Sequence, residues 1–383
     1  GFINDGILNS DHNLIGDSSL SSSETFTGFT PVPTDIIASS DGTDPTPLTG
    51  ILDTVTHWSS ELIPRLADNG GPTQTVALVP GSPAIDAADN AACPSTDQRG
   101  VSRPLGPACD IGAFEAPPSF PPVINLSDLV GSTGYTLNGV AADVETGFSV
   151  SDAGDINGDG IDDLILGAPE ANREVGDEER GASYVVFGRD TQSDGAFPAV
   201  IELSALDGSN GFVLQGAGAE DESGDAVTGA GDLNGDGIDD LAIAAPGSAF
   251  TSVVFGRDTA TEGDFPAGIE LGPVFLDGDN GFRLEGAGST AVSAAGDVNS
   301  DGIADLLIGS SEADPLGEDS GESYLVFGRD TATAGNFPAV FALADLDGSN
   351  GFSLRGASAE DFSGTAVSGA GDLNHDGVAD VVI

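Results

Sequence analysis

The apolar residues of this chain lie in short runs and not along helical stripes. The runs YVVFG at 184–188 and DLILG at 163–167 are rich in β-branched or aromatic residues and are bounded by Gly, Asp or Pro. No long apolar stripe with the helical period is present, and the 56 Gly and 22 Pro residues would interrupt one. The pattern therefore predicts short strands joined by turns, and with them an all-β fold.

The strand-like runs recur in a long repeat that begins with an acidic block. GDINGDGIDD starts at 154 and returns as GDLNGDGIDD at 231, GDVNSDGIAD at 296 and GDLNHDGVAD at 371, so the spacings are 77, 65 and 75 residues. The second unit lacks most of the EANREVGDEERGA segment and the third lacks the AEDES segment, which accounts for the short spacing. Each unit holds about four strand-sized runs, as a propeller blade with long loops does. We expect three blades, the start of a fourth, and a ring that continues beyond Ile383.

The acidic block is spaced like a calcium-binding loop. Oxygen donors at positions 1, 3, 5 and 9, a Gly at position 6 for a sharp turn and a backbone carbonyl at position 7 suit a hard cation. An EF-hand would place Glu at position 12, where these repeats have Leu or Ile inside an apolar run, so the EF-hand is excluded. The alternative is an Asx-rich turn without metal, which needs fewer acidic residues in fixed phase.

Four such loops give about four candidate calcium sites. The candidate ligands are Asp155, Asn157, Asp159, Ile161 and Asp163 in loop 1; Asp232, Asn234, Asp236, Ile238 and Asp240 in loop 2; Asp297, Asn299, Asp301, Ile303 and Asp305 in loop 3; and Asp372, Asn374, Asp376, Val378 and Asp380 in loop 4. Asp162 and Asp239 at position 8 become Ala304 and Ala379 in the later loops, so we expect both carboxylates to be solvated. His375 at position 4 is also expected to face solvent.

The net charge of the chain limits the kinds of partner that it can bind. The chain has 63 acidic and 10 basic residues, the basic ones all Arg, and a formal net charge of −53. This charge disfavours nucleic acid and anionic membrane surfaces and favours cations. No apolar run approaches the length of a membrane helix. The start at GFINDG and the end within a repeat indicate a fragment, with any signal peptide outside it.

Catalytic motifs are missing from the sequence. A chain without Lys has no phosphate-binding P-loop, and HExxH and GxSxG are absent. The three His residues are scattered. A glycosidase carboxylate pair is not excluded by counting acids, but we assign the acids to calcium and predict no enzyme in this part of the protein.

Cys93 and Cys109 are the two cysteines of the chain. A zinc site is disfavoured because no other Cys and no nearby His could complete it. We therefore favour a disulfide, which would contribute about 3 kcal/mol and imply an oxidising compartment.

The repeats resemble the FG-GAP repeats of integrin alpha-chain propellers and their bacterial relatives. TGFSVSDAGDINGDGIDDLILGAP at 146–169 and its copies at 223, 290 and 363 carry the resemblance, over about residues 123–383. It implies a seven-bladed propeller, here about 3.5 blades, with calcium in each loop-bearing blade and a role in adhesion or recognition at a cell surface. GAP at 167–169 becomes AAP at 244–246 and GSS at 309–311, which leaves ligand specificity open.

The first part is similar to the closing segment of bacterial surface β-helix proteins of the choice-of-anchor Q type. NGGPTQTVALVPGSPAIDAAD at 69–89 and CPSTDQRGVSRPLGPACDIGAFE at 93–115 carry this resemblance. It implies that residues 1 to about 60 are the last coils of a right-handed parallel β-helix. Arg99 and Arg103 would pair with Asp97, Asp110 or Glu115, or form surface ion pairs of little energetic value.

Together these observations predict a β-helix end with its capping segment at 1–116, a Pro-rich linker at 117–122 and truncated propeller blades at 123–383. The expected function is that of a calcium-binding adhesion or recognition module on a bacterial surface or in a secreted protein, with a protein or glycan partner contacting variable loops at 170–182 and 312–322. The alternatives are a non-catalytic accessory module of an extracellular polysaccharide-active enzyme, and an architectural spacer in a surface layer.

Overall fold

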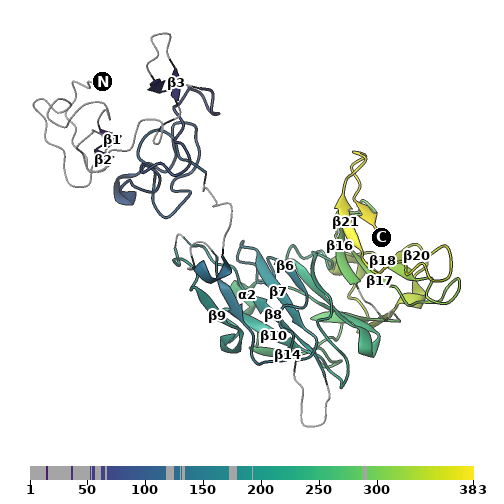
Figure 1. The fold of residues 1–383 in the computed structure, drawn as a ribbon. Coiled ribbons are helices and arrows are strands. Elements are labelled where there is room, and N and C mark those ends of the chain that lie inside the picture. The colour runs from purple at the N-terminus through teal and green to yellow at the C-terminus, as the bar shows by residue number, and fades with distance from the viewer. Residues whose placement is uncertain are drawn as a thin grey trace, which may run out of the picture. The chain divides into compact units, whose positions relative to one another are not determined.

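The computed structural model describes residues 14–15, 36–37, 52, 54–56, 62–64, 67–117, 125–129, 131, 134–171, 179–191, 193–286, 288 and 291–383. Strands predominate in the described part, and its α-helices are single turns such as α2 (Thr259–Glu262) and α3 (Thr331–Ala334) (Figure 1). The predicted all-β fold is therefore confirmed. Among the described helices, none is long and apolar enough to cross a membrane.

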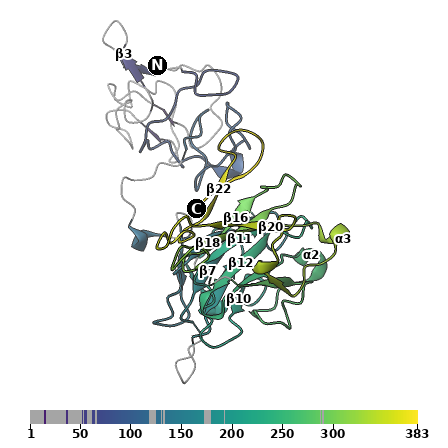
Figure 2. The same ribbon diagram turned by 90° about the vertical axis from the view of Figure 1, so that its right-hand side faces the viewer.

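The second half of the chain is built from four-stranded antiparallel blades (Figure 2). Blade 1 contains β6 (Val150–Gly154), β7 (Asp163–Ala168), β8 (Ala182–Val186) and β10 (Gly211–Gln215). Blade 2 contains β11 (Val227–Gly231), β12 (Asp240–Ala245), β13 (Phe250–Val254) and β15 (Gly281–Glu285). Blade 3 contains β16 (Ala291–Gly296), β17 (Asp305–Ser310), β18 (Glu322–Val326) and β20 (Gly351–Arg355). A further hairpin, β21 (Ser368–Gly371) and β22 (Asp380–Val382), begins the next repeat. One blade per repeat, and a partial propeller, are as predicted.

The outer strand of a blade also pairs with a short strand from the next repeat, which the sequence did not predict. β14 (Gly268–Glu270) runs parallel to β10, and β19 (Val340–Ala342) runs parallel to β15. In the same way β5 (Thr136–Asn138) pairs with β9 (Val200–Glu202). The short strands β9, β14 and β19 lie between the third and fourth strands of their own repeat. Blade 1 is thus tied to blade 2, and blade 2 to blade 3, by backbone hydrogen bonds.

The blades also share hydrophobic cores. The first strands β6, β11, β16 and β21 lie against one another in chain order. Ile165 and Leu214 of blade 1 pack in one cluster with Leu241 of blade 2. The ring of Phe212 stacks on Phe265 of the next repeat at 4.3 Å between centroids. The middle strands are therefore covered on both faces. This explains why β12 continues after Asp240 as the apolar run LAIAA and is buried at every residue.

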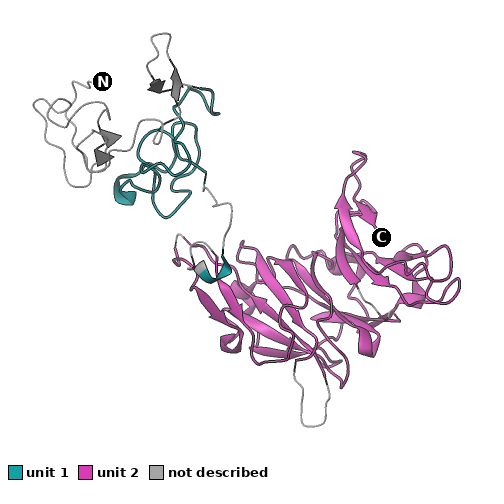
Figure 3. Ribbon diagram, in the orientation of Figure 1, with its two compact units in different colours: residues 1–128 teal, residues 129–383 magenta. Residues whose placement is uncertain are grey.

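The chain divides into two compact units, residues 1–128 and 129–383 (Figure 3). In the first unit, β1 (Leu14–Ile15) pairs in parallel with β2 (Ile36–Ile37), and β3 (Thr54–Thr56) pairs antiparallel with β4 (Leu62–Pro64). Residues 67–117 follow an irregular path with one described single-turn helix, η2 (Asn90–Ala92). Most of the predicted β-helix and of the linker at 117–122 lies outside the described residues. The β-helix, its capping segment and the three domain boundaries stay predictions.

Candidate metal centres

Each predicted calcium loop joins the first two strands of a repeat. Loops 1 to 4 lie between β6 and β7, β11 and β12, β16 and β17, and β21 and β22. The position 9 aspartates Asp163, Asp240, Asp305 and Asp380 each open the second strand, as the sequence indicated. The glycine before position 1 has a positive φ in every loop, between 64° and 73°, and lies at a shift in strand register. A residue without a Cβ suits this bulge, which turns the acidic side chains into the loop.

In loop 1 the acidic side chains accept hydrogen bonds from backbone amides of the same loop. Asp155 Oδ1 accepts from the Asp159 N–H at 3.0 Å, and its Oδ2 accepts from the Gly160 N–H at 2.8 Å. Asn157 Oδ1 accepts from the same Asp159 N–H at 2.8 Å. Asp159 Oδ1 accepts from the Ile161 N–H at 2.9 Å. The loop is thus a set of nested Asx turns that brings its carboxylates together on one tight curl.

The same bonds recur in the other loops. In loops 2, 3 and 4, position 1 accepts from the N–H groups of positions 5 and 6, position 3 accepts from position 5, and position 5 accepts from position 7. The structure therefore gives the side chains at positions 1, 3 and 5 the same arrangement in all four loops. Ile161, Ile238, Ile303 and Val378 hold position 7, where only the backbone was predicted to be a ligand.

The position 9 carboxylates are buried in blades 1 to 3. Asp163 is 4% exposed, and Asp240 and Asp305 are 0% exposed. Loss of solvation raises the pKa of Asp163 to about 7, against two backbone hydrogen bonds that lower it, and the charges of Asp159 and Asp155 raise it further. Burial raises the pKa of Asp305 to about 6 and that of Asp240 well above its usual range. Loops 1 to 3 therefore each hold a buried acid whose ionised form is opposed by its surroundings.

The chemistry of the loops fits a hard divalent cation. Every candidate donor is an oxygen, and a carboxylate oxygen that accepts one N–H still has a lone pair for a metal. Within the described residues, no arginine forms an ion pair with a loop aspartate. Among those residues, no group of three or more His, Cys, Asp or Glu side chains converges on one metal position. The carboxylates point to loop amides in this structure, so a cation would have to draw them toward a common centre.

Two contacts of the loops were missed in the sequence. Asp163 Oδ1 accepts from the Gly188 N–H at 2.7 Å, and Gly256 and Gly328 make the same bond to Asp240 and Asp305. These glycines belong to the sequence VFGRD, which recurs at 186–190, 254–258 and 326–330. The threonine that follows GRD reaches back to the preceding repeat.

That second contact joins loops 1 and 2 to the blade that follows each of them. The N–H and Oγ1 of Thr259 both donate to the carbonyl oxygen of Asn157, each at 3.0 Å. Thr331 donates in the same way to the carbonyl of Asn234. Position 3 of a loop therefore faces the candidate cation with its side chain and the next blade with its backbone.

The expectation that both position 8 acids are solvated is wrong for Asp239. Asp162 is exposed, but Asp239 is half-buried, and its Oδ2 accepts from the N–H of Asp155 in loop 1 at 2.9 Å. Sequence reasoning could not place loop 2 beside loop 1. His375 is exposed at position 4, as predicted, with a φ of 63°.

The two deletions that shorten the spacing of 65 residues both fall in blade 2 of the structure, on loops whose longer counterparts in blades 1 and 3 bond to each other. In blade 3, the N–H groups of Glu360 and Phe362 donate to the carbonyls of Glu318 and Asp319 at 2.9 and 3.0 Å. In blade 1, the Ser223 N–H donates to the Arg180 carbonyl at 3.1 Å. The predicted partner loop at 312–322 is thus one side of a paired structure. The other predicted loop, 170–182, lies partly outside the described residues.

Comparisons with known proteins agree with this geometry. The FG-GAP repeat pattern matches residues 148–186, 223–258 and 289–326, which cover the first three strands and the acidic loop of blades 1 to 3. The chain therefore contains three FG-GAP repeats. Loop 4 lies outside these matches.

The curated relatives are integrin alpha chains. Integrin alpha-8 of Gallus gallus is 32% identical over 127 residues, or 32% of this chain and 10% of the relative. Integrin alpha pat-2 of Caenorhabditis elegans is 33% identical over 115 residues, or 30% and 8%. Integrin alpha-5 of Xenopus laevis is 29% identical over 194 residues, or 49% and 16%. The chain thus spans a small part of the length of these relatives, and the similarity supports an integrin-type FG-GAP propeller.

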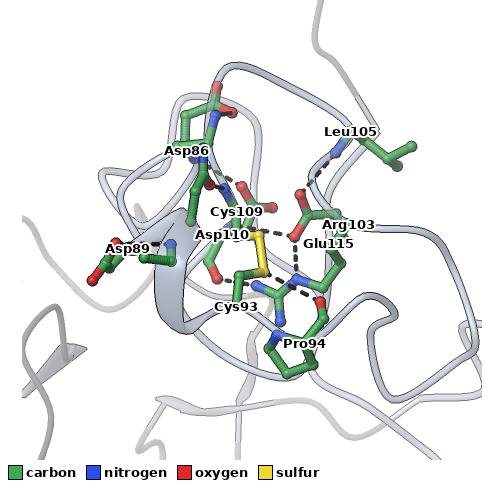
Figure 4. Close-up of a disulfide and its surroundings, with 12 residues drawn as sticks. Asp86, Asp89, Cys93, Pro94, Arg103, Leu105, Cys109, Asp110 and Glu115 are labelled. Carbon is green, nitrogen blue, oxygen red and sulfur yellow. Dashed lines mark hydrogen bonds and ion pairs between the residues drawn. A yellow bond between two sulfur atoms is a disulfide. The ribbon is translucent and has the colours of Figure 1, made fainter. Parts of the chain in front are cut away.

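The first unit contains the predicted disulfide. Cys93 and Cys109 are bonded, with Cα atoms 6.4 Å apart (Figure 4). Beside it, Arg103 Nε donates to Glu115 Oε2 at 2.7 Å (Figure 4). Glu115 also accepts from the N–H groups of Leu105 and Asp110, each at 3.0 Å. The disulfide and a buried, fully bonded acid together stabilise a segment with little regular structure.

Arg99 forms a second ion pair in this unit, with Asp97 at 2.7 Å. Its guanidinium carbon also lies 3.8 Å from the ring centroid of Phe114. Burial alone would raise the pKa of Asp97, but hydrogen bonds from the Glu115 N–H and from Arg99 outweigh it and lower that pKa to about 2. The arginine pairing is confirmed, and the alternative of surface ion pairs is wrong, because Asp97 and Glu115 are buried.

Proposed function

We propose that this chain is a calcium-binding adhesion or recognition module of a secreted or surface-displayed bacterial protein, and that calcium is structural in its blade loops. The observation that carries the proposal is the buried acid at position 9 beside other carboxylates in blades 1 to 3. The FG-GAP repeats and the similarity to integrin alpha chains support it. The disulfide supports an extracellular location. The net charge of −53 supports a cationic ligand.

In loop 1 calcium would be held by Asp155, Asn157, Asp159, Asp163 and the carbonyl of Ile161. The bound ion would supply the positive charge that offsets the repulsion among three carboxylates. The chain itself does the rest of the work. Asp163 links the loop to Gly188 of its own blade, and Asn157 links it to Thr259 of the next. Ordering the loop therefore orders the junction between two blades.

The role of these residues is not catalytic in this proposal. The module would present a rigid array of loops to a protein or glycan at a cell surface. The paired loops of blades 1 and 3 are the candidate contacts, because loops vary in length on a constant strand frame. In blade 3 they expose Leu316 and Phe362, which are 58% and 45% exposed, among acidic residues.

Calcium titration of the chelator-treated chain tests the proposal. Isothermal calorimetry should give about four sites, and the melting temperature should rise with calcium because the ion binds the folded state. Asp159→Ala should remove one site. Glu285→Ala, which removes an exposed acid from the end of β15, is the charge-matched control and should keep all four sites. Absence of binding heat at millimolar calcium would contradict the proposal.

A further inference from the structure

Neighbouring metal loops are in direct contact, and the contact differs from one junction to the next. The residue at position 8 of one loop packs against the glycine that precedes position 1 of the loop before it. At the first junction a Cβ on Gly154 would lie 2.6 Å from Cγ of Asp239. At the next two junctions, a Cβ on Gly231 would lie 2.8 Å from Cβ of Ala304, and a Cβ on Gly296 would lie 2.9 Å from Cβ of Ala379. The position is the same, but a carboxylate is present at the first of these junctions alone.

This carboxylate reaches a predicted ligand residue of the other loop. Asp239 Oδ2 accepts the N–H of Asp155, the residue at position 1 of loop 1, at 2.9 Å. At the later junctions the backbone makes the contact instead. The N–H of Ala304 donates to the carbonyl of Asp232 at 3.1 Å, and that of Ala379 donates to the carbonyl of Asp297 at 3.2 Å.

From these contacts we propose that Asp239 of loop 2 is a positioning residue for the cation of loop 1 and makes the affinity of loop 1 depend on occupancy of loop 2. The proposal rests on the calcium function proposed above. Asp239 fixes the peptide plane of Asp155, so it sets the direction of the first ligand carboxylate. It also brings one more negative charge to the site from outside loop 1.

A cation in loop 2 would affect loop 1 through Asp240, the residue next to Asp239. Asp240, next to Asp239 in the chain, is the position 9 ligand of loop 2 and opens β12. A cation on Asp240 would hold this backbone in one conformation and with it the carboxylate of Asp239. Residues that orient the ligands of a metal commonly change its affinity by about 10- to 100-fold when they are removed.

Hydrogen–deuterium exchange during calcium titration tests this proposal, because peptides from the separate loops report separate midpoints. Asp239→Ala should raise the calcium midpoint of loop 1 about tenfold and leave loops 3 and 4 unchanged. Asp162→Ala is the matched control, since it removes the same type of residue at the same position from loop 1 itself. This control should shift the calcium midpoint of loop 1 less than Asp239→Ala does. Asp239→Asn keeps an oxygen for the Asp155 N–H and should restore part of the affinity.

A second comparison measures the coupling between sites. Asp236→Ala, which disables loop 2, should raise the midpoint of loop 1. Asp301→Ala, which disables loop 3, should raise the midpoint of loop 2 less, because Ala304 carries no charge to that junction.

The outcomes separate the two proposals. If no loop of the unmodified chain gains protection with calcium, the calcium function itself is wrong, and this inference with it. If the loops are protected but Asp239→Ala shifts its own loop most, or shifts loop 1 no more than Asp162→Ala does, the role of Asp239 is wrong while the calcium function stands.

Discussion

Replacing Asp163 by Asn in the metal-free chain should change stability in opposite directions at low and high pH. Burial raises the pKa of Asp163 from 3.8 to about 7, so the folded state holds this proton more tightly than the unfolded state does. The stability that the protonated acid contributes is complete below the unfolded value and is lost as pH rises through the folded one. A shift of about 3 units corresponds to about 4 kcal/mol between pH 4 and pH 7.

The substitution removes the free-energy cost of a buried charge at pH 7, but it also removes one hydrogen-bond acceptor. Both oxygens of Asp163 accept a backbone N–H, from Ile156 at 3.1 Å and from Gly188 at 2.7 Å. Asn can accept one of these and leaves the other donor unsatisfied, at a cost of about 1–3 kcal/mol. Asp163→Asn should therefore destabilise the metal-free chain at pH 4 and stabilise it by about 1–3 kcal/mol at pH 7.5.

Urea denaturation of both chains in the presence of chelator, from pH 4 to pH 8, measures this change in the sign of the stability difference. Glu285→Ala, at an exposed site, should show no change of sign. Calcium at pH 7.5 should reverse the order, because the unmodified chain gains binding energy at loop 1 and the variant does not. A penalty of the same size at pH 4 and pH 7.5 would refute the reasoning, since it would show that the charge of Asp163 costs nothing in the folded chain.

Three further changes test the structural argument. Phe282→Ala, in the stacked core between blades 2 and 3, should destabilise the chain by about 3–5 kcal/mol in urea denaturation. Replacing Cys93 and Cys109 by Ser should cost about 3 kcal/mol and speed protease cleavage of residues 67–117, mapped by mass spectrometry. Gly256→Ala would bring its Cβ against the carbonyl oxygen of Asp239 and should lower the melting temperature, whereas Gly288→Ala, which meets no atom within 4 Å, should not.

The sequence predicted the repeat, its strands and the acidic loops because all of these are local patterns. After Asp240, the run LAIAA is apolar throughout because β12 is covered on both faces, and Asp240 opens that strand because the loop closes there. The short strands β14 and β19 were missed because their parallel partners lie in the preceding repeat. Their three residues carry too little pattern to identify a partner at that distance.

Asp239 was missed for the same reason. At position 8 of its own loop it has no evident task, and its replacement by Ala304 and Ala379 in the copies suggested a solvated side chain. Its partner, the N–H of Asp155, lies 84 residues away. The glycines of VFGRD were visible as a recurring sequence. Their bond to position 9 joins the end of the third strand of a blade to the start of the second, and no local pattern predicts it.

The two deletions, which both fall in blade 2 of the structure, show how such contacts constrain the copies. On the sequence they are separate events that shorten one spacing. In the structure the long loop between the second and third strands of blade 3 bonds to the long loop that follows the fourth strand, through Glu318 and Glu360. In blade 2 both loops are short. The bond from the Gly286 N–H to the Ala249 carbonyl is present there, as its equivalent from Gly356 to Gly321 is in blade 3. Shortening one loop alone would leave backbone groups of the other without partners, which costs free energy wherever water cannot replace them. The paired loops therefore vary as one element, and a partner that binds this chain would meet them as one surface in each blade.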